Sequence, residues 1–168
     1  MNAELTKMRI IAIVAMALAG LIHLGLGLVA RGNPLAHSLF FGAVGALQFA
    51  WSVALWRRPK PALQRLGLIL AGGAVVLWLL TRVLPAPFAG TPGDVSALGV
   101  TAALSESLAV IALLGLITEQ RLTTSRQSVV LLILREVLTL ILVGLAAYAF
   151  GVAMETFLPT VGLSVRHR

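Results

Sequence analysis

The sequence predicts an all-α membrane protein: a bundle of five transmembrane helices forming a single domain over residues 1–168. Of the 168 residues, 59% are hydrophobic and only 11% are charged, and the mean hydropathy is +0.99. A typical soluble domain is about 45–50% apolar and about 25% charged. A soluble fold of this length has too little interior for so much apolar surface. Soluble enzymes, disordered tails and nucleic-acid-binding modules are therefore excluded.

The apolar residues fall into runs that are long enough to cross a bilayer, which takes roughly 20 residues for about 30 Å of hydrocarbon. Five runs meet this length: residues 8–30, 35–56, 62–84, 95–118 and 137–158. All seven prolines fall between these runs, where a missing backbone N–H is tolerated. Asn33 and Pro34 predict a tight turn between the first two spans. Residues 123–136 are expected to form an amphipathic or interfacial lead-in to the fifth span.

Basic residues predict the orientation, with the N-terminus inside and the C-terminus outside. Eight of them flank the spans on the side of the N-terminus: Lys7, Arg9, Arg57, Arg58, Lys60, Arg65, Arg121 and Arg126. Only three clear positive charges fall on the other side: Arg31, Arg166 and Arg168. This distribution follows the positive-inside rule, so the net charge of +7 does not indicate nucleic acid as a partner. The predicted surroundings are the lipid bilayer, with other membrane subunits or further copies of the chain as candidate partners.

Other counts narrow the class and the chemistry. The eleven arginines outnumber the two lysines, which hints at a GC-rich bacterial genome and so at the bacterial cytoplasmic membrane. The absence of cysteine excludes disulfides, thiolate metal sites and cysteine nucleophiles. Phosphate-binding loops, a nucleophile elbow, a zinc-protease motif and a lysine inside a span are all missing. An enzyme is therefore not the expected function.

Polar residues inside the spans are the strongest functional signal, because an ionisable group in hydrocarbon costs at least about 2.5–3.5 kcal/mol on insertion scales. By the helical rise, these residues lie in the outer half of the membrane or near its middle, and the inner halves contain almost nothing polar. The sequence therefore predicts an outward-facing polar pocket. Its candidate lining residues are His23, His37, Gln48, Arg82, Glu106 and Tyr148.

The chemistry of this set leaves several alternatives open. His23, His37 and Glu106 are the candidate ligands for a transition metal such as Zn²⁺ or Cu²⁺, and a single histidine is a candidate haem ligand. Arg82 is expected to stack on Trp78 one turn away, and Gln48 is expected to bond across helices. The competing interpretation is structural, with Glu106 held in an ion pair by Arg82 or a histidine. The cofactor, if there is one, stays unknown at this point.

A short pattern in the first four spans resembles uncharacterised small multi-pass membrane proteins of high-GC bacteria. The pattern consists of His23, His37 before Phe40-Phe41, Gln48, the segment Thr81-Arg82-Val83-Leu84-Pro85, and a glutamate in the fourth span. The fifth span lies outside the resemblance. The likeness implies that the histidine, glutamine, arginine and glutamate residues act together, and it implies no mechanism.

Three functions are consistent with these observations. The first is a non-enzymatic membrane protein whose outward-facing pocket binds a small ligand or metal. The second is an accessory or scaffold subunit of a larger membrane complex, and the third is a redox subunit that binds haem or quinone. The lack of polar residues in the inner halves argues against a channel, pump or through-membrane transporter.

Overall fold

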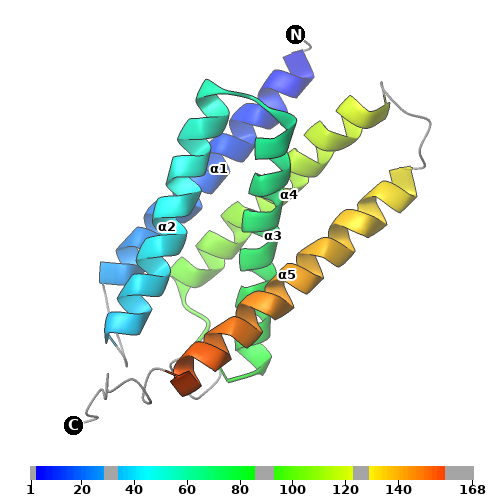
Figure 1. The fold of residues 1–168 in the computed structure, drawn as a ribbon. Helices are drawn as coiled ribbons and strands as arrows, with labels where there is room; N and C mark the ends of the chain where they lie inside the picture. The colour runs from blue at the N-terminus through cyan, green and yellow to red at the C-terminus, as the bar shows by residue number, and fades with distance from the viewer. Residues whose placement is uncertain (1–2, 29–33, 86–92, 123–128, 158–168) are drawn as a thin grey trace.

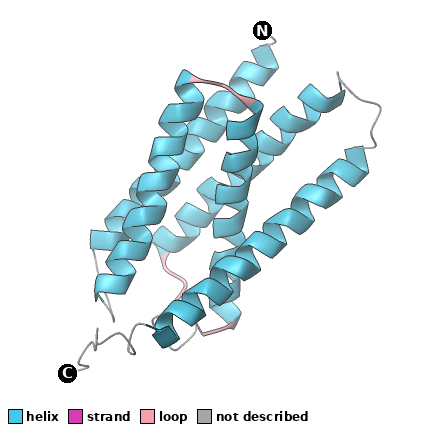
Figure 2. Cartoon of the chain, in the orientation of Figure 1, coloured by secondary structure: helices cyan, strands magenta, loops and turns pink. Residues whose placement is uncertain are grey.

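The computed structural model describes residues 3–28, 34–85, 93–122 and 129–157, which are helical apart from short connections (Figures 1 and 2). The five helices are α1 (Ala3–Leu28), α2 (Pro34–Arg57), α3 (Pro61–Val83), α4 (Ala97–Leu122) and α5 (Val129–Phe157). All five are long and apolar enough to cross a membrane. This confirms the prediction of an all-α protein with five candidate spans. The turn at Asn33, residues 86–92 and residues 123–128 of the predicted lead-in lie outside the described residues.

Proline marks three of the helix boundaries, as expected for a residue without a backbone N–H. Pro34 begins α2 and Pro61 begins α3, while Pro85 follows the end of α3. Helix α5 begins at Val129, so it takes in the last part of the predicted lead-in as well as the predicted fifth span, and its candidate span is Ile133–Ala153. The apolar run from Val129 carries the helix through Arg135 and Glu136, and these two side chains form an ion pair with each other.

Helices α1 to α4 pack as a four-helix bundle, and α5 lies outside it against α3 (Figure 1). In the bundle α1 packs on α2 and α4, and α3 packs on α4, with a smaller contact between α2 and α3. We use the name Arg82 end for the end of the bundle at which α1 and α3 terminate. The opposite end, at which α2 and α4 terminate, is the Lys60 end. Consecutive helices therefore run in opposite directions along the bundle.

Close approach of the helices depends on small residues at the contacts. A Cβ atom on Gly45 of α2 would lie 2.6 Å from the Gly20 carbonyl oxygen of α1. Between α3 and α5, a Cβ on Gly73 would lie 3.0 Å from Val143. In lipid the association of helices rests on such packing rather than on the hydrophobic effect. Gly20 and Gly45 therefore allow the close contact between α1 and α2.

Candidate functional site

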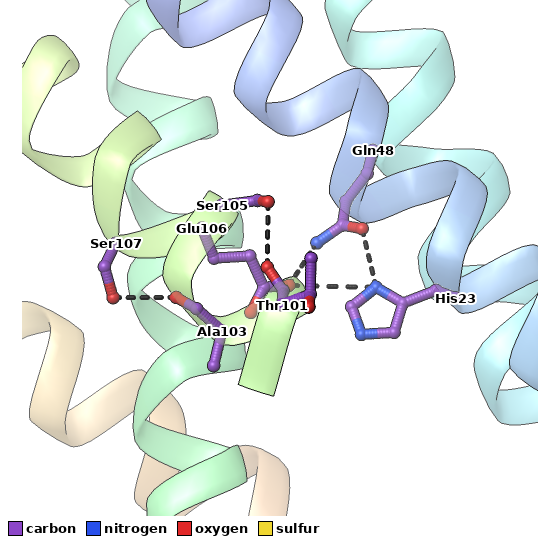
Figure 3. Close-up of polar contacts among 7 residues, drawn as sticks. All are labelled: His23, Gln48, Thr101, Ala103, Ser105, Glu106 and Ser107. Atoms are coloured by element: carbon purple, nitrogen blue, oxygen red, sulfur yellow. Dashed lines mark hydrogen bonds and ion pairs between the residues drawn. The ribbon is translucent and has the colours of Figure 1, made fainter. Parts of the chain in front are cut away.

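Three polar side chains from three helices meet inside the four-helix bundle (Figure 3). His23 of α1 lies with its Nδ1 atom 2.8 Å from Gln48 Oε1 of α2. Gln48 Nε2 donates a 2.7 Å hydrogen bond to Glu106 Oε1 of α4. The direct separation between His23 Nδ1 and Glu106 Oε1 is 3.7 Å. We refer to His23, Gln48 and Glu106 as the polar triad.

The triad has almost no contact with the surroundings of the protein. The exposed fractions are 9% for His23, 1% for Gln48 and 2% for Glu106. Burial of polar groups is tolerated when they are hydrogen-bonded, and burial of a charge also requires a partner. Because the Gln48 amide nitrogen donates to Glu106, its oxygen is the atom that accepts from His23. The Nδ1 atom of the imidazole therefore carries a proton.

The glycine contact between α1 and α2 positions two members of the triad. Gly20 precedes His23 by one turn of α1, and Gly45 precedes Gln48 by one turn of α2. A Cβ added to Gly20 would also lie 3.3 Å from the Gln48 side chain. Residues three positions apart lie on the same side of a helix. The approach of the two backbones at the glycines therefore brings the imidazole and the amide together.

Hydroxyl groups near the triad bond to their own helices. Ser105 donates to the Thr101 carbonyl at 2.8 Å, and Ser107 donates to the Ala103 carbonyl at 2.7 Å (Figure 3). On α2, Ser52 donates to the Gln48 carbonyl at 2.9 Å. Such bonds to the carbonyl four residues earlier are typical of serine and threonine in helices. They satisfy the hydroxyls and leave the triad to bond within itself.

His37 reaches the triad only through an aromatic ring. The ring centroids of His37 and Phe41 are 4.6 Å apart, and those of Phe41 and His23 are 5.6 Å apart. Phe40 packs edge-on against Phe41 with centroids 5.2 Å apart. The half-buried His37 thus lies on the Arg82 side of His23. The Phe41 ring stands between the two imidazoles, so they do not form a common set of ligands.

Arg82 and Tyr148 belong to a different part of the structure. The predicted stacking of Arg82 on Trp78 is confirmed, with the guanidinium carbon 5.2 Å from the ring centroid. The guanidinium also donates to the Asp94 carbonyl, and the Gly93 amide donates to the Thr81 carbonyl at 2.8 Å. Arg82 therefore fastens the segment before α4 to the end of α3.

Tyr148 makes the corresponding contact for α5. Its hydroxyl donates a 2.9 Å hydrogen bond to the Pro85 carbonyl, just after α3. The bond fixes the Arg82 end of α5 against the end of α3. The six predicted site residues therefore divide into the triad, the neighbouring His37, and two residues that secure helix ends.

The predicted metal ligands are not gathered into one site. Within the described ranges, no group of three or more histidine, aspartate or glutamate side chains is placed to hold a metal ion. Glu106 pairs with His23 and not with Arg82. Of the two predicted histidine ligands, only His23 approaches the carboxylate. The geometry therefore fits a hydrogen-bonded triad better than a three-ligand metal centre.

An apolar cavity of about 250 Å³ lies between α3, α4 and α5. Its lining includes Gly72, Val76, Val110 and Leu140, and Ser107 is its polar member. None of the six predicted site residues lines this cavity. A hydrophobic wall of this kind suits hydrocarbon rather than a polar ligand.

Buried polar residues also occur toward the Lys60 end, where the sequence predicted almost none. Gln64 of α3 and Glu136 of α5 are both buried. Among the described residues, Gln64 Oε1 and Arg9 Nε are buried atoms without a hydrogen-bond partner. Gln64 lies inside the third predicted span, so the sequence alone could have identified it as a polar residue within the membrane. Glu136 was missed because the fifth span was expected to begin one residue later.

No protein-family model, no curated protein sequence and no solved structure matches the chain.

Proposed function

We propose that this protein is a non-enzymatic, multi-pass protein of the bacterial cytoplasmic membrane whose polar triad binds a proton from the outer side. The observation that supports it is the buried chain of hydrogen bonds from His23 through Gln48 to Glu106. The proton is the smallest member of the predicted ligand class. A buried carboxylate beside an imidazole is a pair of groups suited to holding it.

Burial favours a proton over a larger ligand. Gln48 and Glu106 are among the most completely buried side chains of the bundle. Next to these two side chains, the α1 and α2 backbones are in contact at Gly20 and Gly45. This contact leaves no space for a larger ligand between the two helices. A proton needs no cavity, since it is held on a nitrogen or oxygen atom already in place. The pairing also offers the carboxylate a way to avoid an uncompensated buried charge.

The outer side is assigned from the basic residues. The Lys60 end carries Arg57, Arg58, Lys60 and Arg65 near the helix termini, and by the positive-inside rule it faces the cytoplasm. The Arg82 end then faces outward. His37 lies on this side of the triad, half-buried and followed by Phe41 and His23. Protons are therefore proposed to enter past His37.

Infrared difference spectroscopy of the purified protein tests the proposal. As the pH is changed, the wild type is expected to show a protonated-carboxyl band that Glu106→Gln removes. Glu119→Gln is the matched control, because Glu119 lies on the same helix but is exposed. His23→Ala is expected to shift the pH at which the Glu106 band changes, since it removes the neighbouring imidazole.

Two results would contradict proton binding at the triad. One is a spectrum in which Glu106→Gln removes no more carboxyl signal than Glu119→Gln does. The other is a Glu106 band that stays constant over the whole pH range in which the protein remains folded. Helical circular dichroism recorded on the same samples shows whether each variant is folded.

The accessory-subunit hypothesis keeps one observation in its favour. Helix α5 packs mainly on α3 and exposes large apolar side chains along its length, including Leu131, Leu138, Leu142 and Phe150. A helix of a partner protein could cover these residues in place of lipid. Mass measurement after gentle detergent extraction separates a complex from a single chain. An absorption spectrum of the same sample tests the haem alternative, which, like the quinone alternative, stays a prediction.

A further inference from the structure

The apolar cavity between α3, α4 and α5 has a buried floor and an open rim. At the floor, Gly72 of α3 lies so close to α5 that an added Cβ would be 2.5 Å from the Leu140 side chain. At the rim, Ile111 of α4 and Ile141 of α5 have exposed fractions of 68% and 42%. Since α4 and α5 share only a small contact, the cavity opens to the surroundings of the protein between these two helices.

The cavity is suited to hydrocarbon, because its polar member is already bonded. The Ser107 hydroxyl donates to the Ala103 carbonyl of its own helix at 2.7 Å, and the other lining residues are apolar. The volume of about 250 Å³ is smaller than that of pockets for drug-sized ligands, which is about 300–1,000 Å³. It is also too small for an α-helix, whose diameter is about 10–12 Å with side chains. The space fits a single hydrocarbon chain.

Arg65 lies on the same face of α3 as the cavity floor, nearer the Lys60 end. It precedes Gly72 by seven residues, which is two helical turns and about 10 Å. The Arg65 side chain is exposed, and within the described part of the chain it has no hydrogen-bond or ion-pair partner. On α5, Glu136 is paired with Arg135 instead. The guanidinium of Arg65 is therefore available to an anion from outside the chain.

An exposed apolar strip of α5 leads from the Lys60 end to the cavity. Val130, Ile133 and Leu134 precede the lining residue Val137 by one to two turns, and their exposed fractions are 72%, 41% and 61%. Helices α3 and α5 both begin at the Lys60 end and pack against each other (Figure 1). The strip and Arg65 therefore approach the cavity from the same end.

The depths of Arg65 and the cavity match those of the two parts of a phospholipid. Gly72 is eleven residues after Pro61, the start of α3, or about 16 Å along the helix, close to half of the roughly 30 Å of hydrocarbon. Arg65 is about 6 Å from that start, from where its long side chain reaches the headgroup region. The guanidinium thus lies at the level of a phosphate, and the cavity lies at the level where an acyl chain ends.

We propose that this face of α3, α4 and α5 binds one anionic phospholipid from the leaflet at the Lys60 end. The guanidinium of Arg65 binds the phosphate, whose oxygens suit its planar fork of donors, and one acyl chain fills the cavity. The exposed Arg58 and Lys60, just before α3, add positive charge that favours a lipid with a net negative charge over a zwitterionic one. The site is separate from the triad and does not depend on proton binding there.

Native mass spectrometry of the purified protein, with phosphatidylglycerol or phosphatidylcholine added, tests the headgroup contact. The wild type is expected to bind one phosphatidylglycerol more tightly than phosphatidylcholine. Arg65→Gln is expected to weaken that binding about tenfold, because it removes charge-assisted hydrogen bonds. Arg57→Gln is the matched control, since it removes the same charge at an exposed position of α2 near the Lys60 end.

The chain contact is tested in the same way by filling the cavity. Val110→Phe is expected to weaken phosphatidylglycerol binding about tenfold, because it displaces buried methylene groups of the acyl chain. Val14→Phe on the exposed face of α1 is its control. Ile111→Trp at the open rim, with Ile10→Trp as control, repeats the test with a side chain outside the core. Glycerol phosphate, which is a headgroup without chains, is expected not to displace the lipid.

Several results would overturn the lipid site. Equal binding by Arg65→Gln and Arg57→Gln would remove the phosphate contact, and wild-type binding by folded Val110→Phe and Ile111→Trp would remove the chain contact. Phosphatidylcholine bound as tightly as phosphatidylglycerol, or displacement by glycerol phosphate, would show a different ligand class. A second copy of the chain or another protein that Ile111→Trp releases would make this face a protein interface. None of these results bears on the infrared signal of Glu106, so the proposed function is decided separately.

Discussion

The amide of Gln48 donates a 2.7 Å hydrogen bond to Glu106 Oε1 and so joins α2 to α4 across the interior of the bundle. The same side chain accepts from His23 on α1. A glutamine is suited to this place because its amide is a donor at one atom and an acceptor at the other. The bonds also fix which way the amide points. Gln48 is therefore the residue on which the geometry of the triad depends.

Gln48→Met is expected to destabilise the protein although methionine has a similar size. The substitution leaves the His23 N–H and the Glu106 carboxylate buried without their shared partner, at a cost of about 1–3 kcal/mol for each unsatisfied group. Thermal unfolding in detergent measures the loss, and Leu47→Met at the adjacent exposed position is the control. The double variant Gln48→Met with Glu106→Met should recover part of the stability, because it removes the buried carboxylate. A single variant as stable as its control would show that the triad is not formed.

Gly45→Ala is expected to force α1 and α2 apart. The new Cβ would lie 2.6 Å from the Gly20 carbonyl oxygen and 2.8 Å from the Leu24 backbone nitrogen. Backbone atoms cannot turn aside as a flexible side chain does, so a loss of about 1–3 kcal/mol is expected from overpacking. Gly42→Ala is the matched control three residues earlier, where a Cβ meets nothing within 4 Å.

The two alanine variants are expected to change stability in opposite directions. Alanine favours a helix over glycine by up to about 1 kcal/mol, and at position 42 no clash opposes that gain. Unfolding midpoints of the two variants in the same detergent give the comparison. Equal midpoints would mean that α1 and α2 do not approach at Gly45.

Much of the fold follows from local sequence, because apolar run length and proline position are local properties. Pro34, Pro61 and Pro85 mark helix boundaries that the structure shares. The start of α5 was less predictable. An ion pair between Arg135 and Glu136 allows both charges to sit within the helix, whereas the sequence pattern indicated a boundary there.

The composition of the site was only partly predictable, because residue depth is local and helix neighbourhood is not. Arg82 and Tyr148 lie toward the same end as His37, so depth alone grouped them with the triad. The structure places them at the ends of α3 and α5 instead. The cross-helix bonding predicted for Gln48 is confirmed. Its partners depend on the order in which α1, α2 and α4 pack around the interior.

Arg82→Ala is expected to loosen the segment before α4 without disturbing the triad. The substitution removes the bond to the Asp94 carbonyl and the contact over Trp78. Hydrogen exchange at the Gly93 amide, which donates to the Thr81 carbonyl, should become faster because local opening governs exchange. Arg65→Ala, an exposed arginine near the other end of α3, is the control. Unchanged exchange at Gly93, or loss of the Glu106 infrared signal, would contradict the division between Arg82 and the triad.

The orientation of the bundle is open to a direct test, because the chain contains no cysteine. Val95 and Lys60 are exposed residues near opposite ends of the bundle. In intact cells, a membrane-impermeant maleimide is expected to label Val95→Cys, and Lys60→Cys only after the cells are permeabilised. The expectation follows from the excess of basic residues at the Lys60 end.

The reverse labelling pattern would place His37 and the triad toward the cytoplasm. Proton binding at Glu106 would then respond to internal rather than external pH. The labelling result therefore decides from which side of the membrane a proton reaches the triad.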